Sequence, residues 1–350
     1  MDRRDFLRGS LASAAVAGIG VSTSGTAAAM RAGSGPVRHV VTIVVDGLTS
    51  SVIAKMPAAN IPGLTRMRRF GATTLNARTL IEKTSTLPNH ASMLTGRWAQ
   101  LPGGHGVVYG NDERENTIHD AAKEYVPSVF DVVHDRGLRT ELYATKSKFE
   151  FFNRSWNEQY GDPDTVGDNN GRDKLDVYRY GEPDEVTDWL VSSLTGSTPP
   201  AFAMMCLEQT DEAGHIHGFE SAAYRRSVQQ ADAQISRVLQ AVANDTVLRG
   251  NTVVVVVSDH GGYDKGHVDP TKLRNFRVPF LIWGAGVARG ADLYALNSGG
   301  RRDPGTRQPA YSAKVAPIRV AEVANVATNL LGLPVVPTSR IGNGPALKVR

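Results

Sequence analysis

Short runs of apolar residues recur along the chain, and the most apolar of them are continuous instead of alternating with polar positions. The runs at residues 40–45 and 252–257 consist almost entirely of valine, isoleucine and threonine. This pattern is typical of strands in a parallel sheet, because helices cover both faces of such a sheet. Less regular runs at residues 138–145, 201–207 and 278–283 predict three further strands.

Segments with helical periodicity lie between these strands. Residues 128–136, 184–194 and 221–248 are predicted helices, and the longest places its apolar side chains on one face. A last helix at residues 317–331 begins at a proline and is followed by Gly332. Strands that alternate with helices are typical of the α/β class, so we expect a largely parallel sheet with helices on both faces.

Three stretches interrupt this alternation, at residues 99–125, 151–182 and 289–313, and all three are rich in Gly, Asp, Asn, Arg and Pro. We expect loops there that form a small cap over the active face of a single catalytic domain, residues 30–350. Aromatic side chains in the middle stretch either stack on a substrate or pack the cap against the sheet. These are Phe151, Phe152, Trp156, Tyr160, Tyr178 and Tyr180.

The first 29 residues have the features of an export signal. Residues 3–8 (RRDFLR) form a twin-arginine start, a weakly apolar run follows at residues 11–21, and three alanines precede Met30. The run is too short to span a bilayer, and no other segment resembles a membrane span. We therefore expect a secreted, periplasmic or cell-wall-associated protein that leaves the cell through the twin-arginine translocation machinery.

The net charge bears on the class of partner, and the cysteine content bears on disulfide bonds. Lysine and arginine total 39 and acidic residues 35, which gives a net charge of +4. Residues 1–29 contain three arginines and two aspartates, so the remainder carries +3 (4 − 3 + 2). A balance this weak does not indicate a dedicated nucleic-acid partner. The single cysteine, Cys206, lies in an apolar run and is expected to be buried and unpaired.

Acidic and imidazole side chains are concentrated just past three of the predicted strands. They are Asp46 after the first strand, Asp211 and His215 after the strand at 201–207, and Asp259, His260 and His267 after the strand at 252–257. The carboxyl ends of parallel strands meet at one edge of a sheet, so we expect these side chains to converge. Three carboxylates and three imidazoles suit two divalent ions of the zinc class, and such a pair can support in-line phosphoryl displacement.

Thr86 is a candidate nucleophile beside this cluster. Residues 83–96 are predicted to form a loop that turns into a helix, with Thr86 as the N-cap and Pro88 in the first turn. The free N–H groups and the positive end of the helix dipole favour an anion or an alkoxide there. Most threonines at such positions are only caps, so the assignment depends on the neighbouring metal ligands.

Together these segments resemble the alkaline phosphatase superfamily, and within it the type I phosphodiesterase/nucleotide pyrophosphatase branch. The motifs are Asp46-Gly47, residues 86–90 (TLPNH), residues 211–215 (DEAGH) and residues 259–261 (DHG), in the family's order. The resemblance covers nearly the whole chain after the export signal and implies the alkaline-phosphatase-like sandwich fold. It also implies that Thr86 is the nucleophile and forms a phospho-threonine intermediate.

The resemblance implies a set of ligands as well. One zinc ion is held by Asp46, Thr86, Asp259 and His260, and the other by Asp211, His215 and a further histidine. Asn111 matches the family's asparagine that binds a phosphoryl oxygen.

The further histidine is where this chain departs from the family. That histidine commonly lies far downstream, but no histidine follows His267 here. We predict that His267 completes the second site, on a glycine-containing loop that folds back over the metal. His217 is the reserve candidate.

Lys146 and Lys148 also follow a predicted strand, at residues 138–145. They are either a solvated pair on a loop or contacts to the substrate. The Lys-x-Lys spacing is similar to that of phosphonoacetate hydrolase, another branch of the superfamily, where the pair holds the substrate's second anionic group.

The sequence therefore predicts a secreted metal-dependent hydrolase of phosphodiesters or nucleotide pyrophosphates, with a small phosphorylated molecule such as a nucleotide as substrate. The alternative is a phosphomonoesterase or phosphonate hydrolase that uses Lys146 and Lys148 as an anion clamp. A sulfatase is disfavoured, because residues 86–90 lack the Cys/Ser-x-Pro-x-Arg pattern that sulfatases need. A non-catalytic binding protein is disfavoured by the full set of ligand types.

Overall fold

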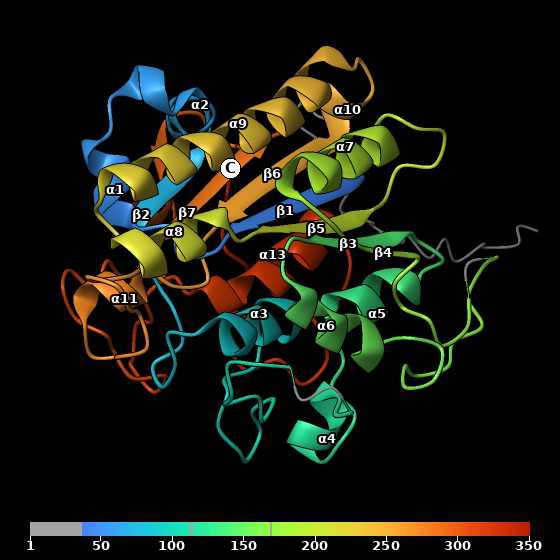
Figure 1. Cartoon of the computed structure of the whole chain (residues 1–350). Coiled ribbons are helices and arrows are strands. Elements are labelled where there is room, and N and C mark those ends of the chain that lie inside the picture. The colour runs from blue at the N-terminus through green and yellow to red at the C-terminus, as the bar shows by residue number, and fades with distance from the viewer. Residues whose placement is uncertain (1–36, 113–114, 169) are drawn as a thin grey trace, which may run out of the picture. The chain divides into compact units, whose positions relative to one another are not determined.

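A computed structural model describes residues 37–112, 115–168 and 170–350, so the expected export signal lies outside the described residues. The described residues form an eight-stranded sheet flanked by helices (Figure 1). In sheet order the strands are β4 (Val177–Tyr180), β3 (Thr140–Ala144), β5 (Phe202–Leu207), β1 (His39–Val45), β6 (Thr252–Val257), β7 (Arg277–Gly284), β2 (Ala72–Arg78) and β8 (Ala291–Asp292). Only β7 among these runs antiparallel to its neighbours, which confirms the predicted α/β class with a largely parallel sheet.

Helices cover both faces of this sheet. Figure 1 shows α2, α7 and α9 on one side and α3, α5 and α6 on the other. The helices of the first side, by their core cluster or their contact with α9, are α1 (Ser50–Lys55), α2 (Pro62–Phe70), α7 (Pro183–Leu194), α8 (Gln209–His217), α9 (Ala222–Asn244) and α10 (Leu248–Asn251). The helices that share the other core cluster are α3 (Thr86–Thr95), α4 (Ile118–Ala122), α5 (Val129–His134), α6 (Glu150–Ser155) and α13 (Val323–Leu330). The shorter helices are η1 (Ala58–Asn60), η2 (Ser147–Phe149), α11 (Leu273–Phe276), α12 (Leu293–Leu296) and η3 (Val320–Glu322).

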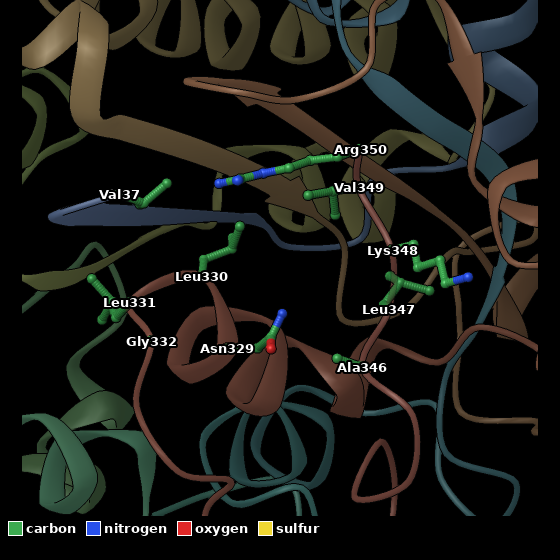
Figure 2. A pocket seen from close by; sticks show the side chains of 10 residues that line it. All are labelled: Val37, Asn329, Leu330, Leu331, Gly332, Ala346, Leu347, Lys348, Val349 and Arg350. Carbon is green, nitrogen blue, oxygen red and sulfur yellow. The ribbon is translucent and has the colours of Figure 1, made fainter. Parts of the chain in front are cut away.

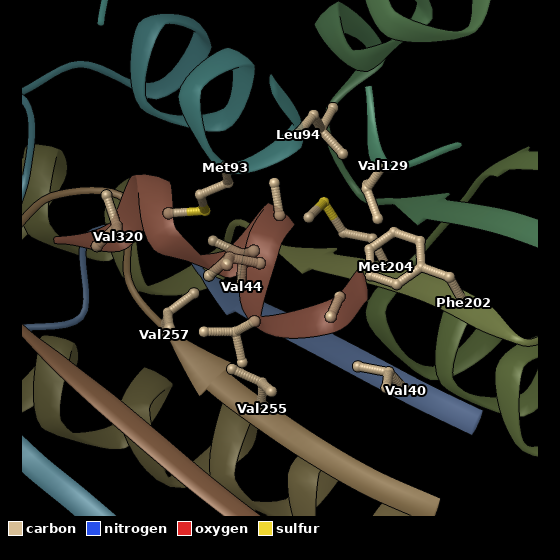
Figure 3. Close-up of a cluster of buried hydrophobic side chains, with 14 of the residues drawn as sticks. Val40, Val44, Met93, Leu94, Val129, Phe202, Met204, Val255, Val257 and Val320 are labelled. Atoms are coloured by element: carbon tan, nitrogen blue, oxygen red, sulfur yellow. The ribbon is translucent and has the colours of Figure 1, made fainter. Parts of the chain in front are cut away.

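Successive residues of the central strands face opposite layers of the core. Val40 and Val44 of β1 belong to a cluster that includes Met93 and Leu94 of α3, as Figure 3 shows. Val41 of β1 belongs instead to the cluster formed with α2, α7 and α9. The sequences of the central strands are continuously apolar because helices bury both faces of each strand. Cys206 is buried and unpaired, as expected.

Two predicted helices have different limits in the structure. The helix expected at residues 221–248 ends at Asn244, because extended backbone at Asp245 separates α9 from α10 and the Asp245 carboxylate accepts the Leu248 N–H. The helix expected to begin at residue 317 begins as η3 at Val320. Ile318 precedes it and accepts a backbone hydrogen bond from Arg78 of β2, which holds that segment extended.

Part of the expected cap belongs to the sheet layers. The stretch 151–182 was expected to be a loop, but it supplies most of α6 and all of β4, while 289–313 supplies β8 and α12. Phe151, Phe152 and Trp156 are fully buried, so these three pack against the sheet. Tyr180 is 56% exposed. The prediction of loops is therefore wrong where apolar side chains reach the core. In the stretch 99–125, α4 is the one helix or strand among the described residues, and the rest is loop.

The two ends of the parallel strands differ in character. At the amino end of β1, Val37, the end of α13 and the C-terminal residues line a cavity of about 450 Å³ (Figure 2). At the carboxyl end, Val45 of β1 pairs with Leu207 of β5, and Val44 pairs with Val257 of β6. Three separate segments therefore leave the sheet side by side. Among the described residues, no helix combines the length and apolar character needed to cross a bilayer.

Candidate active site

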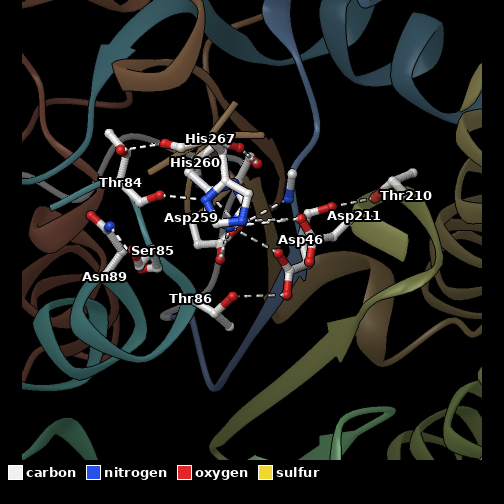
Figure 4. A network of polar contacts seen from close by, with 12 residues as sticks. Asp46, Thr84, Ser85, Thr86, Asn89, Thr210, Asp211, Asp259, His260 and His267 are labelled. Carbon is white, nitrogen blue, oxygen red and sulfur yellow. Dashed lines mark hydrogen bonds and ion pairs between the residues drawn. The ribbon is translucent and has the colours of Figure 1, made fainter. Parts of the chain in front are cut away.

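Three aspartates meet at the carboxyl edge of the sheet (Figure 4). Asp46 follows β1, Asp259 follows β6, and Asp211 lies in the first turn of α8, which follows β5. All three are at least 95% buried. The Nε2 atom of His260 lies 3.2 Å from Asp46 Oδ1, 3.4 Å from Asp259 Oδ2 and 3.9 Å from Asp211 Oδ1. The structure thus gathers the carboxylates around one ring nitrogen.

Local backbone geometry explains the glycine that follows Asp46. Gly47 has a φ of +69°, and a Cβ added there would lie 3.2 Å from the Cα of Asp211. A side chain at this position would therefore be strained and would push α8 away from β1. The Gly47 N–H donates to Asp259 Oδ1 at 3.1 Å, so the same turn also orients a second carboxylate.

Three imidazoles present their Nε2 atoms to this cluster. His260 Nδ1 donates to the carbonyl of Gly261, His267 Nδ1 to that of Thr84, and His215 Nδ1 to that of Lys265. A carbonyl can only accept, so each Nδ1 carries the proton. His267 Nε2 lies 3.1 Å from His215 Nε2 and 3.6 Å from Asp211 Oδ1. Metal-binding histidines are oriented in this way by a partner of the other ring nitrogen.

Unpartnered atoms show what the cluster can hold. Among the described residues, Asp46 Oδ1, Asp211 Oδ1, Asp259 Oδ2 and His260 Nε2 are buried and have no hydrogen-bond partner. Ligand atoms of Asp46, Asp259 and His260 lie within 4.8 Å of one another, and so do those of Asp211, His260 and His267. Buried polar atoms without hydrogen-bond partners are costly, and cations would satisfy them. The residues therefore fit divalent cations.

The ionisation of the cluster reflects a surplus of negative charge. Burial raises the pKa of Asp259 to about 7, and the neighbouring charge of Asp46 adds to the effect. Burial would lower the pKa of His260, but Asp259 and Asp46 outweigh it and raise that pKa to about 9. Burial and the charge of His260 lower the pKa of His267 to about 2, so His267 is neutral and its Nε2 can act as a ligand.

Thr86 points into the same cluster. The N-cap of α3 is Ser85, so the predicted N-cap position of Thr86 is wrong by one residue. The Thr86 hydroxyl therefore does not cap the helix, and its Oγ1 donates to Asp46 Oδ2 at 3.4 Å. Thr86 is 4% exposed and begins a ten-residue helix, so its side chain lies at the positive end of the dipole.

Two residues that the sequence did not single out hold the segment before Thr86. Asn89 Oδ1 accepts the Leu80 N–H, and its Nδ2 donates to the carbonyls of Lys83 and Ser85. Thr84 Oγ1 donates to the carbonyl of His267, whose ring donates back to the carbonyl of Thr84. This pair of bonds joins segments 183 residues apart, and no local pattern indicates it.

The two lysines have different partners. Lys146 Nζ lies 2.5 Å from Asp46 Oδ2 and 2.7 Å from Asp211 Oδ2. Lys148 Nζ donates to the carbonyl of Gly110 at 2.8 Å, next to the exposed Asn111. Lys146 is therefore part of the aspartate cluster, whereas Lys148 joins the segment that carries Asn111.

The reserve histidine lies outside the cluster. His217 is exposed in the last turn of α8, and the structure brings His267 to Asp211 instead. His215, on the same helix, does reach the cluster: its Nε2 lies 3.5 Å from Asp211 Oδ1, and its side chain is 45% exposed.

Known proteins are similar to this chain in sequence. The family model for type I phosphodiesterase/nucleotide pyrophosphatase matches residues 40–268, a segment that includes every candidate ligand and Thr86. Mouse (Mus musculus) ectonucleotide pyrophosphatase/phosphodiesterase family member 1 is 24% identical over 224 residues, 57% of this chain and 21% of the relative. GPI ethanolamine phosphate transferase 1 of Yarrowia lipolytica is 25% identical over 256 residues, 70% of this chain and 27% of the relative. The chain thus spans about a fifth to a quarter of these curated relatives.

Solved structures share the fold. Murine ectonucleotide pyrophosphatase/phosphodiesterase 5, solved as an inactive form in complex with AMP, superposes with a TM-score of 0.60 at 12% identity, covering 86% of this chain and 96% of that one. A putative sulfatase from Bacteroides thetaiotaomicron gives a TM-score of 0.57 at 14% identity, covering 86% and 72%. With the family match, these similarities show that the chain belongs to the type I phosphodiesterase/nucleotide pyrophosphatase family of the alkaline phosphatase superfamily.

Proposed function

We propose that this protein is a metal-dependent hydrolase that cleaves phosphodiesters or nucleotide pyrophosphates by attack of Thr86 on phosphorus. The observation that carries the proposal is the position of the Thr86 hydroxyl, 3.4 Å from Asp46 within a cluster of buried, unpartnered ligand atoms. Membership of the family supports the same chemistry. A hydroxyl is a weak nucleophile on its own, so the neighbouring cation sites are what make this threonine suitable.

The ligand atoms divide into two sets in the proposed centre. Asp46, Asp259 and His260, together with Thr86, would hold one ion. Asp211, His215 and His267 would hold the other, because the Nε2 atoms of both histidines lie near each other and near Asp211 Oδ1. Carboxylate and imidazole donors together suit zinc-class ions. When bound, the ions lower the pKa of the threonine hydroxyl and neutralise charge on the phosphoryl oxygens.

Side chains of the protein perform the remaining tasks. The Thr86 hydroxyl loses its proton as the Oγ–P bond forms and the bond from phosphorus to the leaving oxygen breaks, and the leaving oxygen takes up a proton from solvent. Water then cleaves the Oγ–P bond, returns one proton to Thr86 Oγ and releases the phosphoryl product. Burial would raise the pKa of Asp46, but Lys146 and His260 outweigh it and hold that pKa well below its usual range. Asp46 therefore stays ionised, and its Oδ2 orients the hydroxyl. The N-terminal end of α3 favours the phosphoryl charge, and Asn111 is proposed to bind one phosphoryl oxygen.

The contact of Lys148 favours a second candidate class of substrate, phosphomonoesters or phosphonates. Lys148 donates to the carbonyl of Gly110 and so brings a cation next to Asn111. A cation at this place would suit the extra charge of a phosphomonoester or a phosphonate. The murine relative bound to AMP favours a nucleotide-containing substrate, and we place the diester first.

Relative rates on a nitrophenyl phosphodiester and on the corresponding monoester distinguish the two. We expect the metal-loaded protein to prefer the diester and to lose both activities when a chelator removes the metal. Lys148→Ala should lower both rates by a similar factor. If Lys148 is an anion clamp, the monoester rate alone should fall by about 10- to 100-fold, the value of one charge-assisted hydrogen bond. Such a selective loss would favour the alternative.

We also propose that residues 1–29 direct export through the twin-arginine machinery and that residues 30–350 form one catalytic domain. The paired arginines, the short apolar run and the alanines before Met30 support this. Sequencing the amino terminus of the exported protein tests the cleavage position.

A further inference from the structure

Lys146 shares two carboxylates with the candidate metal ligands. Asp46 directs Oδ2 to Lys146 Nζ at 2.5 Å and Oδ1 to His260 Nε2 at 3.2 Å. Asp211 directs Oδ2 to the same ammonium at 2.7 Å and Oδ1 to His267 Nε2 at 3.6 Å. Each of these aspartates therefore has one oxygen on a fixed cation and one unpartnered oxygen on the side of the imidazoles.

The sequence treats Lys146 and Lys148 as one pair, either solvated or in contact with substrate, but the surroundings of the two side chains differ. The Lys146 side chain is 12% exposed, and within the part of the chain that the structure describes its two polar contacts are carboxylates. Two carboxylate oxygens at hydrogen-bond distance favour the charged ammonium form of Lys146. Burial and the charge of Lys146 lower the pKa of Lys148 instead.

We propose that Lys146 is a built-in competitor for the metal ions. Its ammonium bridges Asp46 and Asp211, one aspartate from each proposed set of ligands, and holds the two sets together before metal binds. The same contact weakens the binding of divalent cations to both carboxylates. The inference rests on the proposed two-metal centre and assigns Lys146 a positioning role that acts through the aspartates.

Electrostatics support both parts of this role. Without metal, three carboxylates lie within 4 Å of His260 Nε2, and their mutual repulsion opposes folding. The ammonium offsets that repulsion at the two aspartates it contacts. A divalent ion on Oδ1 would share its carboxylate with the ammonium on Oδ2, so two positive charges would repel at short range in a buried site. Removing the ammonium should therefore destabilise the metal-free protein and strengthen metal binding.

Calorimetric titration of the chelator-stripped protein with Zn²⁺ and with Mn²⁺, at one pH, tests the proposal. Lys146→Met keeps the apolar stem and removes the charge. We expect its metal-free form to melt at a lower temperature than the wild type, and its affinity for metal to rise by about tenfold or more, the change expected from removing a buried like charge. A substitution that only disturbed the structure would weaken metal binding instead.

Two variants serve as controls. Lys146→Arg keeps the positive charge, and Lys148→Met removes a neighbouring charge that contacts the Gly110 carbonyl and no aspartate. Both should bind metal within about threefold of the wild type. Where Lys146→Met does not fold without metal, refolding in excess Zn²⁺ followed by chelator competition gives the affinity, and Lys146→Gln is expected to shift it in the same direction.

The outcomes separate this inference from the function on which it rests. An unchanged or weaker affinity of Lys146→Met, in a wild type that binds two ions, overturns the role of Lys146 and leaves the proposed function standing. Failure of the wild type and every variant to bind metal overturns both.

Discussion

Replacing Thr86 by alanine is expected to abolish hydrolysis of phosphoryl esters while leaving the fold and the other metal ligands in place. Loss of the attacking group should lower kcat by roughly 10⁴- to 10⁶-fold, as removal of an enzyme nucleophile does elsewhere. Among the described residues, the hydroxyl makes one hydrogen bond, of 3.4 Å, so the free energy of unfolding should fall by no more than about 1 kcal/mol. Steady-state rates on a nitrophenyl phosphodiester, with metal content measured on the same samples, check this.

Ser85→Ala is the matched control for this experiment. Ser85 is the adjacent hydroxyl and the N-cap of α3, but its side chain makes no capping hydrogen bond. The control should keep activity within about tenfold of the wild type, because a cap residue contributes at most about 2 kcal/mol to stability and none to bond formation. Thr86→Ala that retained a similar level of turnover would exclude the hydroxyl as the nucleophile.

Replacing His267 by alanine should remove one of two bound ions and most of the activity. His267 Nε2 lies near both His215 Nε2 and Asp211 Oδ1, so its loss leaves the second set of ligands incomplete. Removal of a residue that only orients a metal ligand costs about 10- to 100-fold in activity. We expect a larger loss here, because His267 is itself a proposed ligand. Elemental analysis of the purified protein gives the number of ions per chain.

His217→Ala is the control for this substitution. His217 lies two residues after His215 at the exposed end of α8. The variant should keep both ions and near-normal activity. The reverse pattern, with two ions in His267→Ala and one in His217→Ala, would assign the last ligand to His217 and contradict the present assignment.

The central strands could be predicted because their sequence is constrained on both faces. The run expected at 252–257 coincides with β6, and that expected at 201–207 differs from β5 by one residue. A strand that is buried on both faces accepts mainly apolar and β-branched residues, so its sequence is easy to recognise. β2 and β4 were not predicted. β2 mixes threonine, asparagine and arginine with alanine and leucine, and β4 is a four-residue edge strand whose side chains are partly or fully exposed.

The convergence of the aspartates could be expected from topology, but their contacts could not. Asp46, Asp211 and Asp259 follow strands that are neighbours in the sheet, so chain direction alone brings them to one edge. The direction of a long side chain is not part of such a pattern. The sequence therefore leaves Lys146 as either a solvated side chain or a contact to substrate, and only the structure shows that its ammonium lies between two aspartates that are 100 and 65 residues away in sequence.

The contacts of His267 could not be predicted from the sequence either. A nearby histidine after the Asp259-His260 pair was visible in the sequence, and the loop was expected to fold back. The reciprocal hydrogen bonds with Thr84, which orient the ring, depend on a segment 183 residues earlier. No spacing rule connects two such loops, because the distance between them depends on how separate elements pack in the folded chain.

Diffraction from metal-loaded crystals, recorded at the absorption edge of the bound metal, shows whether two ions bind beside Thr86. We expect two anomalous peaks at the carboxyl edge of the sheet. One should contact Asp46, Asp259, His260 and the Thr86 hydroxyl, and the other Asp211, His215 and His267. A single peak, or a pair of ions that leaves Thr86 without a metal contact, would contradict this expectation.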